Sequence, residues 1–212
     1  MYSIENICKK ISIDIGAELK LNDENVAVIN YGLFAVIQIL ISIILAFLLG
    51  AIFNVVVESL IILCSISILR QSSGGVHASS PSICTAVGTI LSVGMAIVIT
   101  NINIDIKSVI CVGSIIFAWS YYIIFKLAPV DSAAKPIKTE AKRKRLKRSS
   151  ISILSVYFVI VIGNIIVYYV TKKVDLLMYS GCIYIGLLWQ VFSLTKSGHV
   201  VLGKLDAFLN KF

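Results

Sequence analysis

The sequence predicts an all-α integral membrane protein with about six transmembrane helices and an amphipathic surface helix at its N-terminus. Of the 212 residues, 58% are hydrophobic and 14% are charged, whereas soluble domains average roughly 45–50% and about 25%. Long stretches also carry no Asp, Glu, Lys or Arg, and each is close to or above the roughly 20 residues that a helix needs to span a bilayer. These stretches are 25–57, 71–104, 108–125, 149–171 and 176–195.

The N-terminal segment 1–24 is predicted to be a surface helix. Apolar residues recur at i, i+3, i+4 and i+7, which places them on one helical face. The segment is too charged to span, so it either lies on the membrane surface or packs against another part of the protein. The residues of the apolar face are Ile4, Ile7, Cys8, Ile11 and Ile15.

The remaining chain divides into six predicted spans within a single polytopic domain, 1–212. A turn near Gly50 separates the first two spans, and all three prolines fall outside the spans, where Pro does not disrupt a helix ladder. A small polar loop is expected over 71–82 and a basic loop over 128–150. The predicted spans are 30–49, 52–69, 83–100, 107–127, 151–170 and 176–194.

The basic residues predict the orientation. If both termini are cytoplasmic, sixteen of the nineteen Lys and Arg lie on the cytoplasmic side, a strong positive-inside bias. The net charge of +8 is therefore attributed to topology and membrane lipid, and nucleic acid is not expected as a partner. The five cysteines form no CxxC pair, so neither a disulfide framework nor a metal site is expected.

His77 and Cys84 are the candidates for catalysis. They lie seven residues apart in and beside the only small, uncharged polar loop that adjoins a span. A thiolate nucleophile needs a base, and His is the usual one. Ser79 or Ser80 can cap a helix whose first residue is Pro81, so Cys84 would lie near the first turn, where the helix dipole favours the thiolate.

Other parts of the sequence, and the His77–Cys84 spacing itself, also have structural explanations that involve no catalysis. A capped helix start with an incidental Cys would have the same spacing. Gln38 and Gln190 are expected to form hydrogen bonds between helices. A dense basic run would anchor its segment at anionic lipid headgroups or dock an acidic substrate. The run consists of Lys142, Arg143, Lys144, Arg145, Lys147 and Arg148.

Two motifs carry a family resemblance. The segment Arg70-Gln-Ser-Ser-Gly-Gly-Val-His77-Ala78, followed by Cys84, resembles the signature of the AgrB family of membrane endopeptidases, which process quorum-sensing propeptides in Gram-positive bacteria. Leu127-Ala-Pro129 with Lys135-Pro136, leading into the basic run, resembles the central loop of that family. The resemblance covers nearly the whole chain in length and in the order of its spans.

The resemblance implies a specific activity. The enzyme would remove the C-terminal tail of an AgrD-like propeptide through a Cys84 thioester, with His77 as the base, and promote thiolactone or lactone closure. It implies a homodimer in the cell membrane. The positive-inside bias places the active site at the cytoplasmic face, and no cofactor is expected. Gln71 or Asp131 is a possible residue for orienting His77. The predicted substrate-binding residues are Arg70, Gly74, Gly75, Lys135 and the six residues of the basic run.

Two other classes of function remain open at this point. A transporter or exporter of a small peptide would need a polar pathway across the bilayer, and the few polar residues of the spans cluster on no evident face. A non-enzymatic scaffold or sensor subunit would need neither His77 nor Cys84.

Overall fold

The computed structural model describes residues 4–76, 80–131, 137 and 139–209. This part of the chain contains eight helices and no strand, and six of the helices are long and apolar enough to cross a membrane. The structure thus confirms the all-α membrane fold and its number of spans. The two further helices are α1 (Ile4–Glu18) and α8 (Lys196–Leu209); the spans are α2 (Asp23–Ile52), α3 (Val56–Ser73), α4 (Pro81–Thr100), α5 (Ile106–Leu127), α6 (Glu140–Thr171) and α7 (Asp175–Ser193).

Two spans are longer than predicted. At about 1.5 Å per residue, the 30 residues of α2 and the 32 residues of α6 extend roughly 45 Å, well beyond a hydrocarbon core of about 30 Å. Asn22 caps α2 by accepting a hydrogen bond from the N–H of Asn25, which places Asp23 and Glu24 inside the helix. The start of the charge-free run therefore did not mark the start of the helix, because Asp23 and Glu24 precede that run but belong to α2.

The basic segment is largely helical, which corrects the prediction of a loop over 128–150. The side chain of Thr139 accepts a hydrogen bond from the N–H of Lys142 and begins α6 there. Lys and Arg are good helix formers, and no Gly or Pro interrupts residues 140–162. The basic run therefore forms the first turns of a helix that continues directly into the membrane.

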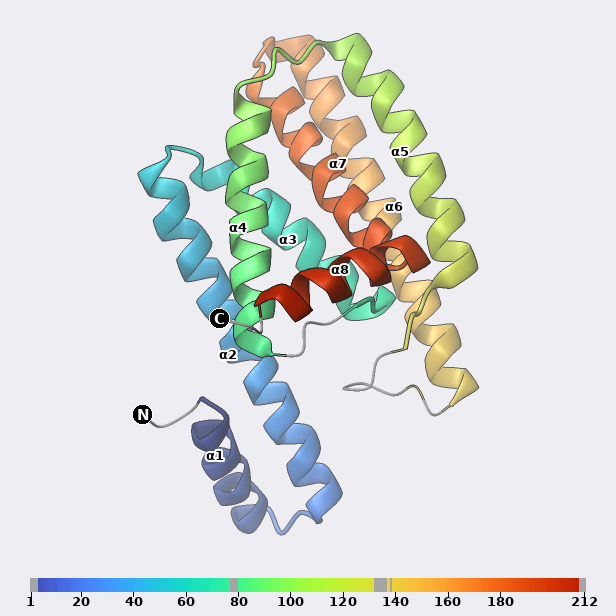
Figure 1. Cartoon of the computed structure of the whole chain (residues 1–212). Coiled ribbons are helices and arrows are strands. Elements are labelled where there is room, and N and C mark those ends of the chain that lie inside the picture. The colour runs from blue at the N-terminus through green and yellow to red at the C-terminus, as the bar shows by residue number, and fades with distance from the viewer. Residues whose placement is uncertain (1–3, 77–79, 132–136, 138, 210–212) are drawn as a thin grey trace.

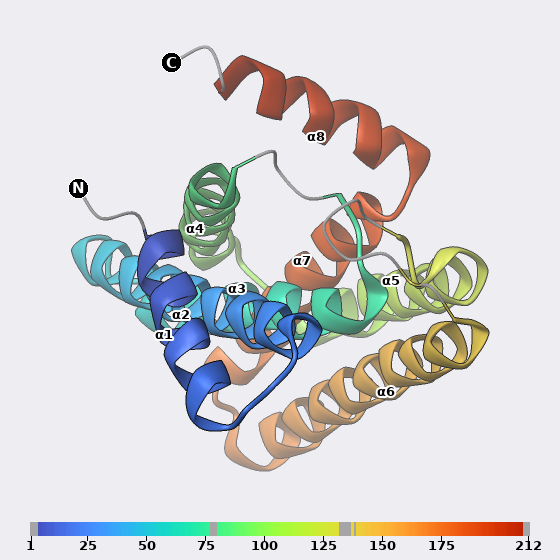
Figure 2. The same cartoon turned by 90° about the horizontal axis from the view of Figure 1, so that it is seen from below.

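The helices α3 and α7 form the centre of the bundle, and they pack against one another more extensively than any other pair. Seen along the bundle, α2 and α4 lie to one side of this pair and α5 and α6 to the other (Figure 2). Two buried tyrosines tie helices together: the hydroxyl of Tyr157 donates to the carbonyl of Ser65 at 3.1 Å, and that of Tyr184 donates to Val109 at 3.0 Å. Gly113 makes room for the Tyr184 ring.

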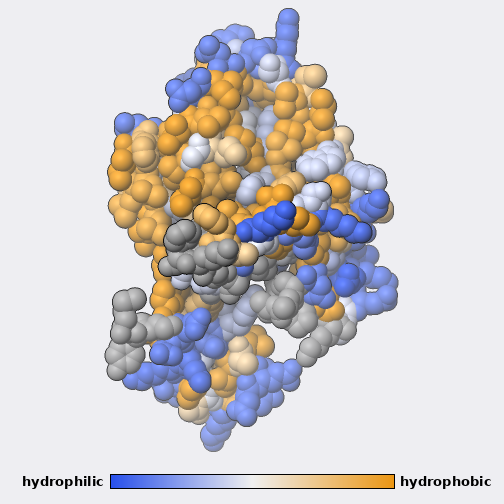
Figure 3. Space-filling view, in the orientation of Figure 1, coloured by the Kyte–Doolittle hydropathy of each residue, from blue (hydrophilic) through white to orange (hydrophobic). Residues whose placement is uncertain are grey.

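The outer surface of the bundle is strongly apolar. On the face shown in Figure 3, hydrophobic side chains form a broad belt and hydrophilic ones gather toward both ends. Large side chains such as Ile44, Phe47, Ile115 and Val159 are exposed along the spans. A soluble protein rarely exposes so large an apolar surface, so this belt is the surface that meets lipid.

The N-terminal helix α1 packs beside the first half of α2 (Figure 1). Its small residues Cys8, Ser12 and Gly16 are buried and face α2, and Gly16 lies so close to Val26 that a Cβ there would clash. Of the four isoleucines of the predicted apolar face, Ile4, Ile7 and Ile11 are exposed and Ile15 is half-buried. The helix therefore packs against the protein on one side and leaves its isoleucines available to a membrane surface.

One end of the bundle, here called the site end, brings together parts that are distant in the sequence. The last residues of α3, the start of α4, the start of α6 and the last residues of α7 all lie there, and α8 crosses it (Figures 1 and 2). Arg70, Gly74 and Cys84, three of the candidate residues from the sequence, lie at this end.

Candidate active site

Cys84 lies in the first turns of α4, as predicted. Ser80 is the N-cap residue with extended backbone dihedrals, and Pro81 occupies the first turn. The N–H of Cys84 donates to the carbonyl of Ser80 at 3.1 Å, which is the first hydrogen bond of the helix. The N–H groups of Ser82 and Ile83 precede this bond and so lie at the positive end of the helix dipole. The side chain of Cys84 is half-buried.

The cysteine borders a cavity of about 60 Å³ at the site end. Residues from α3, α4, α7 and α8 form its walls, together with Val76 from the segment after α3. Most of the lining is apolar, and Arg70 and Asp206 are the charged residues among it. The lining residues are Ile66, Arg70, Val76, Ile83, Cys84, Val87, Gly88, Trp189, Leu202, Leu205 and Asp206.

Arg70 connects the cysteine to the segment that follows α3. One terminal nitrogen of its guanidinium donates a hydrogen bond to the carbonyl of Val76, and its charge acts on Cys84. Its Nε is buried without a partner among the described residues. A donor with spare capacity can bind an incoming carbonyl or carboxylate.

The two glycines after α3 are required by close packing against the chain itself. Gly74 has a φ of +72° and Gly75 a φ of +124°, a backbone region that favours glycine. A Cβ at Gly74 would lie 2.1 Å from the carbonyl oxygen of Val130, and one at Gly75 would lie 2.7 Å from Oγ of Ser193. The N–H of Val130 donates to the carbonyl of Ser73 at 2.9 Å. The predicted role of Gly74 and Gly75 in substrate binding stays a prediction.

Gln190 holds the same segment from the other side. This α7 residue is fully buried, and its Nε2 donates to Oγ of Ser73 at 2.9 Å and to the carbonyl of Gly74 at 2.8 Å. The sequence led us to expect a bond between helices, and the structure shows that it also supports the turn between α3 and Val76. A bond between α2 and α4 is confirmed for Gln38, whose Nε2 donates to Oγ1 of Thr85 at 3.2 Å.

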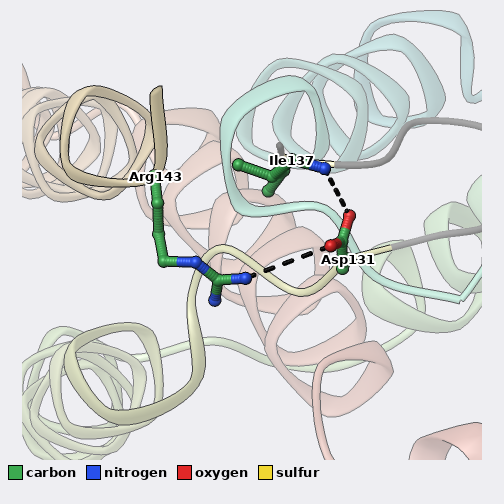
Figure 4. Close-up of polar contacts among 3 residues, drawn as sticks. All are labelled: Asp131, Ile137 and Arg143. Atoms are coloured by element: carbon green, nitrogen blue, oxygen red, sulfur yellow. Dashed lines mark hydrogen bonds and ion pairs between the residues drawn. The ribbon is translucent and has the colours of Figure 1, made fainter. Parts of the chain in front are cut away.

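Several predicted residues are not brought to the cavity. Asp131 accepts a hydrogen bond from the N–H of Ile137 at 2.9 Å and lies 4.0 Å from the guanidinium of Arg143 (Figure 4). Neither Asp131 nor Gln71 lines the cavity. His77 and Lys135 lie outside the described residues, so their predicted roles are not tested by the structure.

The basic run likewise lies on α6, away from the cavity lining. Within it, the ammonium of Lys147 lies 4.2 Å from the centre of the Phe125 ring, which is cation–π geometry. Arg143 reaches Asp131, so the start of α6 is tied to the segment that follows α5. The described residues contain no group of three or more His, Cys, Asp or Glu side chains suited to hold a metal ion.

Sequence reasoning missed Asp206 and the whole of α8. Leu202, Leu205 and Asp206 line the cavity although they follow Cys84 by more than a hundred residues. No local motif marks them. Their i, i+3, i+4 spacing is the one available signal, since it places them on one helical face.

Fold and site together define a multi-pass, all-α membrane protein with a cysteine at the start of a helix and beside a guanidinium. The chain belongs to the Accessory gene regulator B (AgrB) family, whose sequence profile matches residues 8–194. Membership in this family of peptidase-like processing proteins connects the chain with accessory gene regulator quorum sensing and, in general, with an AgrD-like propeptide as partner.

Two curated relatives from Clostridium perfringens match the chain along nearly its full length. An AgrB-like protein of strain SM101 (type A) is 42% identical over 218 residues, which cover 98% of this chain and 99% of the relative. AgrB-like protein 2 of strain 13 (type A) is 41% identical over 216 residues, with the same shares covered. No solved structure matches the chain.

Proposed function

We propose that this protein is a membrane cysteine endopeptidase that removes the C-terminal tail of an AgrD-like autoinducer propeptide and promotes closure of its thiolactone or lactone ring. One observation carries the proposal: Cys84 stands at the positive end of α4, in a cavity that it shares with the Arg70 guanidinium and with Val76. His77 is the residue that follows Val76 in the chain, and one peptide unit separates neighbouring Cα atoms by about 3.8 Å. His77 is the base in this proposal.

The proposed reaction begins with proton transfer from Cys84 to His77. The thiolate attacks the carbonyl carbon that precedes the tail, and His77, now protonated, gives its proton to the leaving amine as the C–N bond breaks. The propeptide body is left as a thioester on Cys84. The N–H groups at the start of α4 and the Arg70 guanidinium are the donors available to the negatively charged oxygen of the tetrahedral intermediate.

Ring closure would release the enzyme. The internal Cys or Ser of the propeptide attacks the thioester carbonyl and forms a thiolactone or lactone. Cys84 is the leaving group and takes up the proton of the attacking group, which restores its thiol. When the nucleophile is Cys, one thioester replaces another, so the step is near thermoneutral. Hydrolysis would destroy that activation, and the apolar residues around the cavity, among them Trp189 and Leu202, support a site that restricts water.

The orientation and partners follow from charge and surface. We place both termini and the site end in the cytoplasm, since sixteen of the nineteen Lys and Arg then lie inside. The basic run at the start of α6 is mostly exposed and would attract both anionic lipid and the acidic tail of the propeptide. A homodimer is part of this proposal, by analogy with the family.

The decisive experiment is cleavage of a synthetic propeptide by the purified protein, followed by mass spectrometry. Cys84→Ser and His77→Ala should each abolish tail removal while the protein still inserts. Cys111→Ser, which replaces an exposed cysteine on α5, serves as the matched control and should cleave at the wild-type rate. Full cleavage by Cys84→Ser would refute the assignment of the nucleophile.

A further inference from the structure

The cavity beside Cys84 extends from the site end into the bundle. Its walls include Arg70 and Ile66, one helical turn apart on α3, and Cys84 and Gly88, one turn apart on α4. The helix α3 runs toward the site end and α4 runs away from it (Figure 1). Ile66 and Gly88 therefore both lie roughly 6 Å deeper in the bundle than Arg70 and Cys84.

The deeper part of the cavity, here called the floor, is formed by packed apolar side chains. Ile66 is buried in a hydrophobic cluster with Ile62 and Val93, and Trp189 of α7 packs against this cluster. Ile66 and Trp189 also line the cavity, and Leu202 of α8 adds a further apolar wall. Cavities with such walls take up apolar groups in preference to water.

Gly88 leaves the floor open. A Cβ added there would have no other group within 4 Å, whereas one at Gly181 or Gly186, in the packed centre, would lie 2.5 Å or 2.6 Å from a neighbouring side chain. Packing therefore does not require a glycine at position 88, and glycine is less favourable than Ala inside a helix. The consequence of the glycine is space, one turn from the Cys84 thiol.

The volume of the cavity limits what it can hold. It measures about 60 Å³, whereas an apolar cavity that takes up benzene measures about 150 Å³. A cavity of less than half that volume fits a compact aliphatic side chain of about the size of Val and is too small for an aromatic ring.

We propose that this cavity is the specificity pocket for the propeptide residue that precedes the cleaved bond, that it takes a compact aliphatic side chain, and that Gly88 sets its depth. This inference rests on the proposed function and adds substrate specificity to it. The carbonyl carbon of that residue bonds to Sγ of Cys84 in the thioester, so its side chain stays beside the cysteine. The acidic tail lies on the other side of the cleaved bond, and the cost of burying charge keeps it out of the apolar floor.

The test compares synthetic propeptides that differ only in the residue before the cleaved bond, which is Gly, Val, Phe or Asp, on the purified full-length protein. One methylene in an apolar pocket changes kcat/KM by roughly 10–200-fold. The wild type should therefore cleave the Val substrate at least about tenfold faster than the Gly and Phe substrates, and the Asp substrate should be slower still. Equal rates for the Val and Asp substrates would overturn the proposal.

Gly88→Leu fills the floor and should lower the Val-to-Gly ratio of kcat/KM by about tenfold or more. Gly88→Ala, which suits a helix better, should lower it less and serves if Gly88→Leu does not accumulate. The ratio compares two substrates on one preparation, so a general loss of stability does not move it. A wild-type ratio in both variants, or a larger response to the residue after the cleaved bond, would refute the pocket.

Gly94→Leu is the matched control. Gly94 lies on the same helix, is exposed, and likewise has no group within 4 Å of an added Cβ, but it does not line the cavity. This variant should keep the wild-type ratio. If Gly94→Leu lowered the ratio as much as Gly88→Leu does, the effect would belong to the helix and not to the pocket, and the proposal would be wrong.

A second readout does not depend on peptide cleavage. Peptidyl chloromethyl ketones with Val or Gly beside the reactive group alkylate nucleophilic cysteines, and mass spectrometry measures the label on Cys84, with Cys84→Ser as the blank. The Val reagent should label the wild type about tenfold faster, and Gly88→Leu should remove that preference. If Cys84→Ser still cleaves the propeptide, the proposed function is wrong. If Cys84→Ser is inactive and Gly88→Leu changes neither ratio, the proposed function stands and the specificity pocket is refuted.

Discussion

The spans α2 and α7 differ in a way that hydropathy alone would misjudge. The apolar window of α2 has a mean hydropathy of 2.8 but only 6% of it is buried in the protein, whereas that of α7 has a mean hydropathy of 1.5 and 61% of it is buried. Lipid tails are as apolar as leucine, so a helix at the periphery must be apolar all round. A helix at the centre can carry polar groups that bond to its neighbours, as Gln190 does.

The comparison therefore separates two kinds of span. At the centre, α3 and α7 hold the turn of Gly74 and Gly75 and the guanidinium of Arg70. At the periphery, α2 presents side chains such as Leu40 and Phe47 outward. If this division is right, a given substitution should strongly lower stability and cleavage at the centre. On α2 the same substitution should lower stability only slightly, or raise it.

Gly74→Ala should have the largest effect. Its Cβ would strike the backbone carbonyl of Val130, and its φ of +72° disfavours any side chain. Strain and overpacking together should lower the free energy of unfolding by about 3 kcal/mol and abolish propeptide cleavage. Thermal unfolding in detergent and the cleavage assay measure the two effects.

Gly32→Ala is the matched control on α2. No other group lies within 4 Å of the Cβ that would be added there, and Ala is the better helix former. The variant should be more stable by roughly 0.5–1 kcal/mol and should cleave at the wild-type rate. Equal destabilisation by the two substitutions would contradict the division between centre and periphery.

Gln190→Leu should have the second-largest effect on stability and cleavage. It leaves the Ser73 hydroxyl and the Gly74 carbonyl without their donor in a buried place, which costs about 1–3 kcal/mol, and cleavage should fall because the turn loses its support. Gln38→Leu removes an equivalent side chain from α2, where its bond reaches Thr85. Bonds between membrane helices average about 0.6 kcal/mol, so the melting temperature should fall less. A larger loss in Gln38→Leu would reverse the ranking.

The sequence predicted the spans well because charge is excluded from lipid, but it placed their ends poorly. A charge-free run reports the thickness of the hydrocarbon and not the length of the helix. For this reason Asp23 and Glu24 were placed before the first span and the basic run was placed in a loop, although both belong to helices. The start of α4 was predicted correctly because Ser80 and Pro81 are local signals.

The site was predicted only where its residues lie close together in the sequence. Arg70 and Cys84 belong to one motif, and the structure brings both to the cavity. Gln190 and Asp206 reach the same end through packing between α3, α7 and α8, which no local pattern encodes. Asp131, a candidate for orienting the base, has its carboxylate bound to the N–H of Ile137 and close to Arg143, and its role toward His77 stays a prediction.

Neutralising the basic run should have a smaller effect, and one that depends on salt. Replacing its six Lys and Arg by Gln leaves the packed centre untouched, because most of these side chains are exposed at the start of α6. Cleavage should fall several-fold at low ionic strength and little at high ionic strength, since exposed charges are screened. Lys172→Gln with Lys173→Gln, at the opposite end of α6, is the control and should not change cleavage. If the six replacements left the cleavage rate unchanged at every ionic strength, the basic run would serve only as a membrane anchor.

Asp105→Asn should have the smallest effect of the series, although this residue caps a span. Its carboxylate accepts hydrogen bonds from the Ser108 hydroxyl and from the N–H groups of Lys107 and Ser108, and the Ser108 hydroxyl is the main cause of its lowered pKa. A carboxylate whose pKa is lower in the folded state stabilises the fold above its unfolded pKa of about 3.9, and loses that contribution as the pH falls through the folded value.

The pH at which a substitution acts therefore distinguishes a helix cap from a residue of the site. The small loss of stability in Asp105→Asn should be constant from pH 5 to 9 and fade only in acid, where the wild-type carboxylate is itself protonated. Its cleavage profile should match the wild type throughout, because Asp105 lies outside the lining of the Cys84 cavity. A shift of the cleavage midpoints in Asp105→Asn would show that the profile reports general stability and not the charges around Cys84.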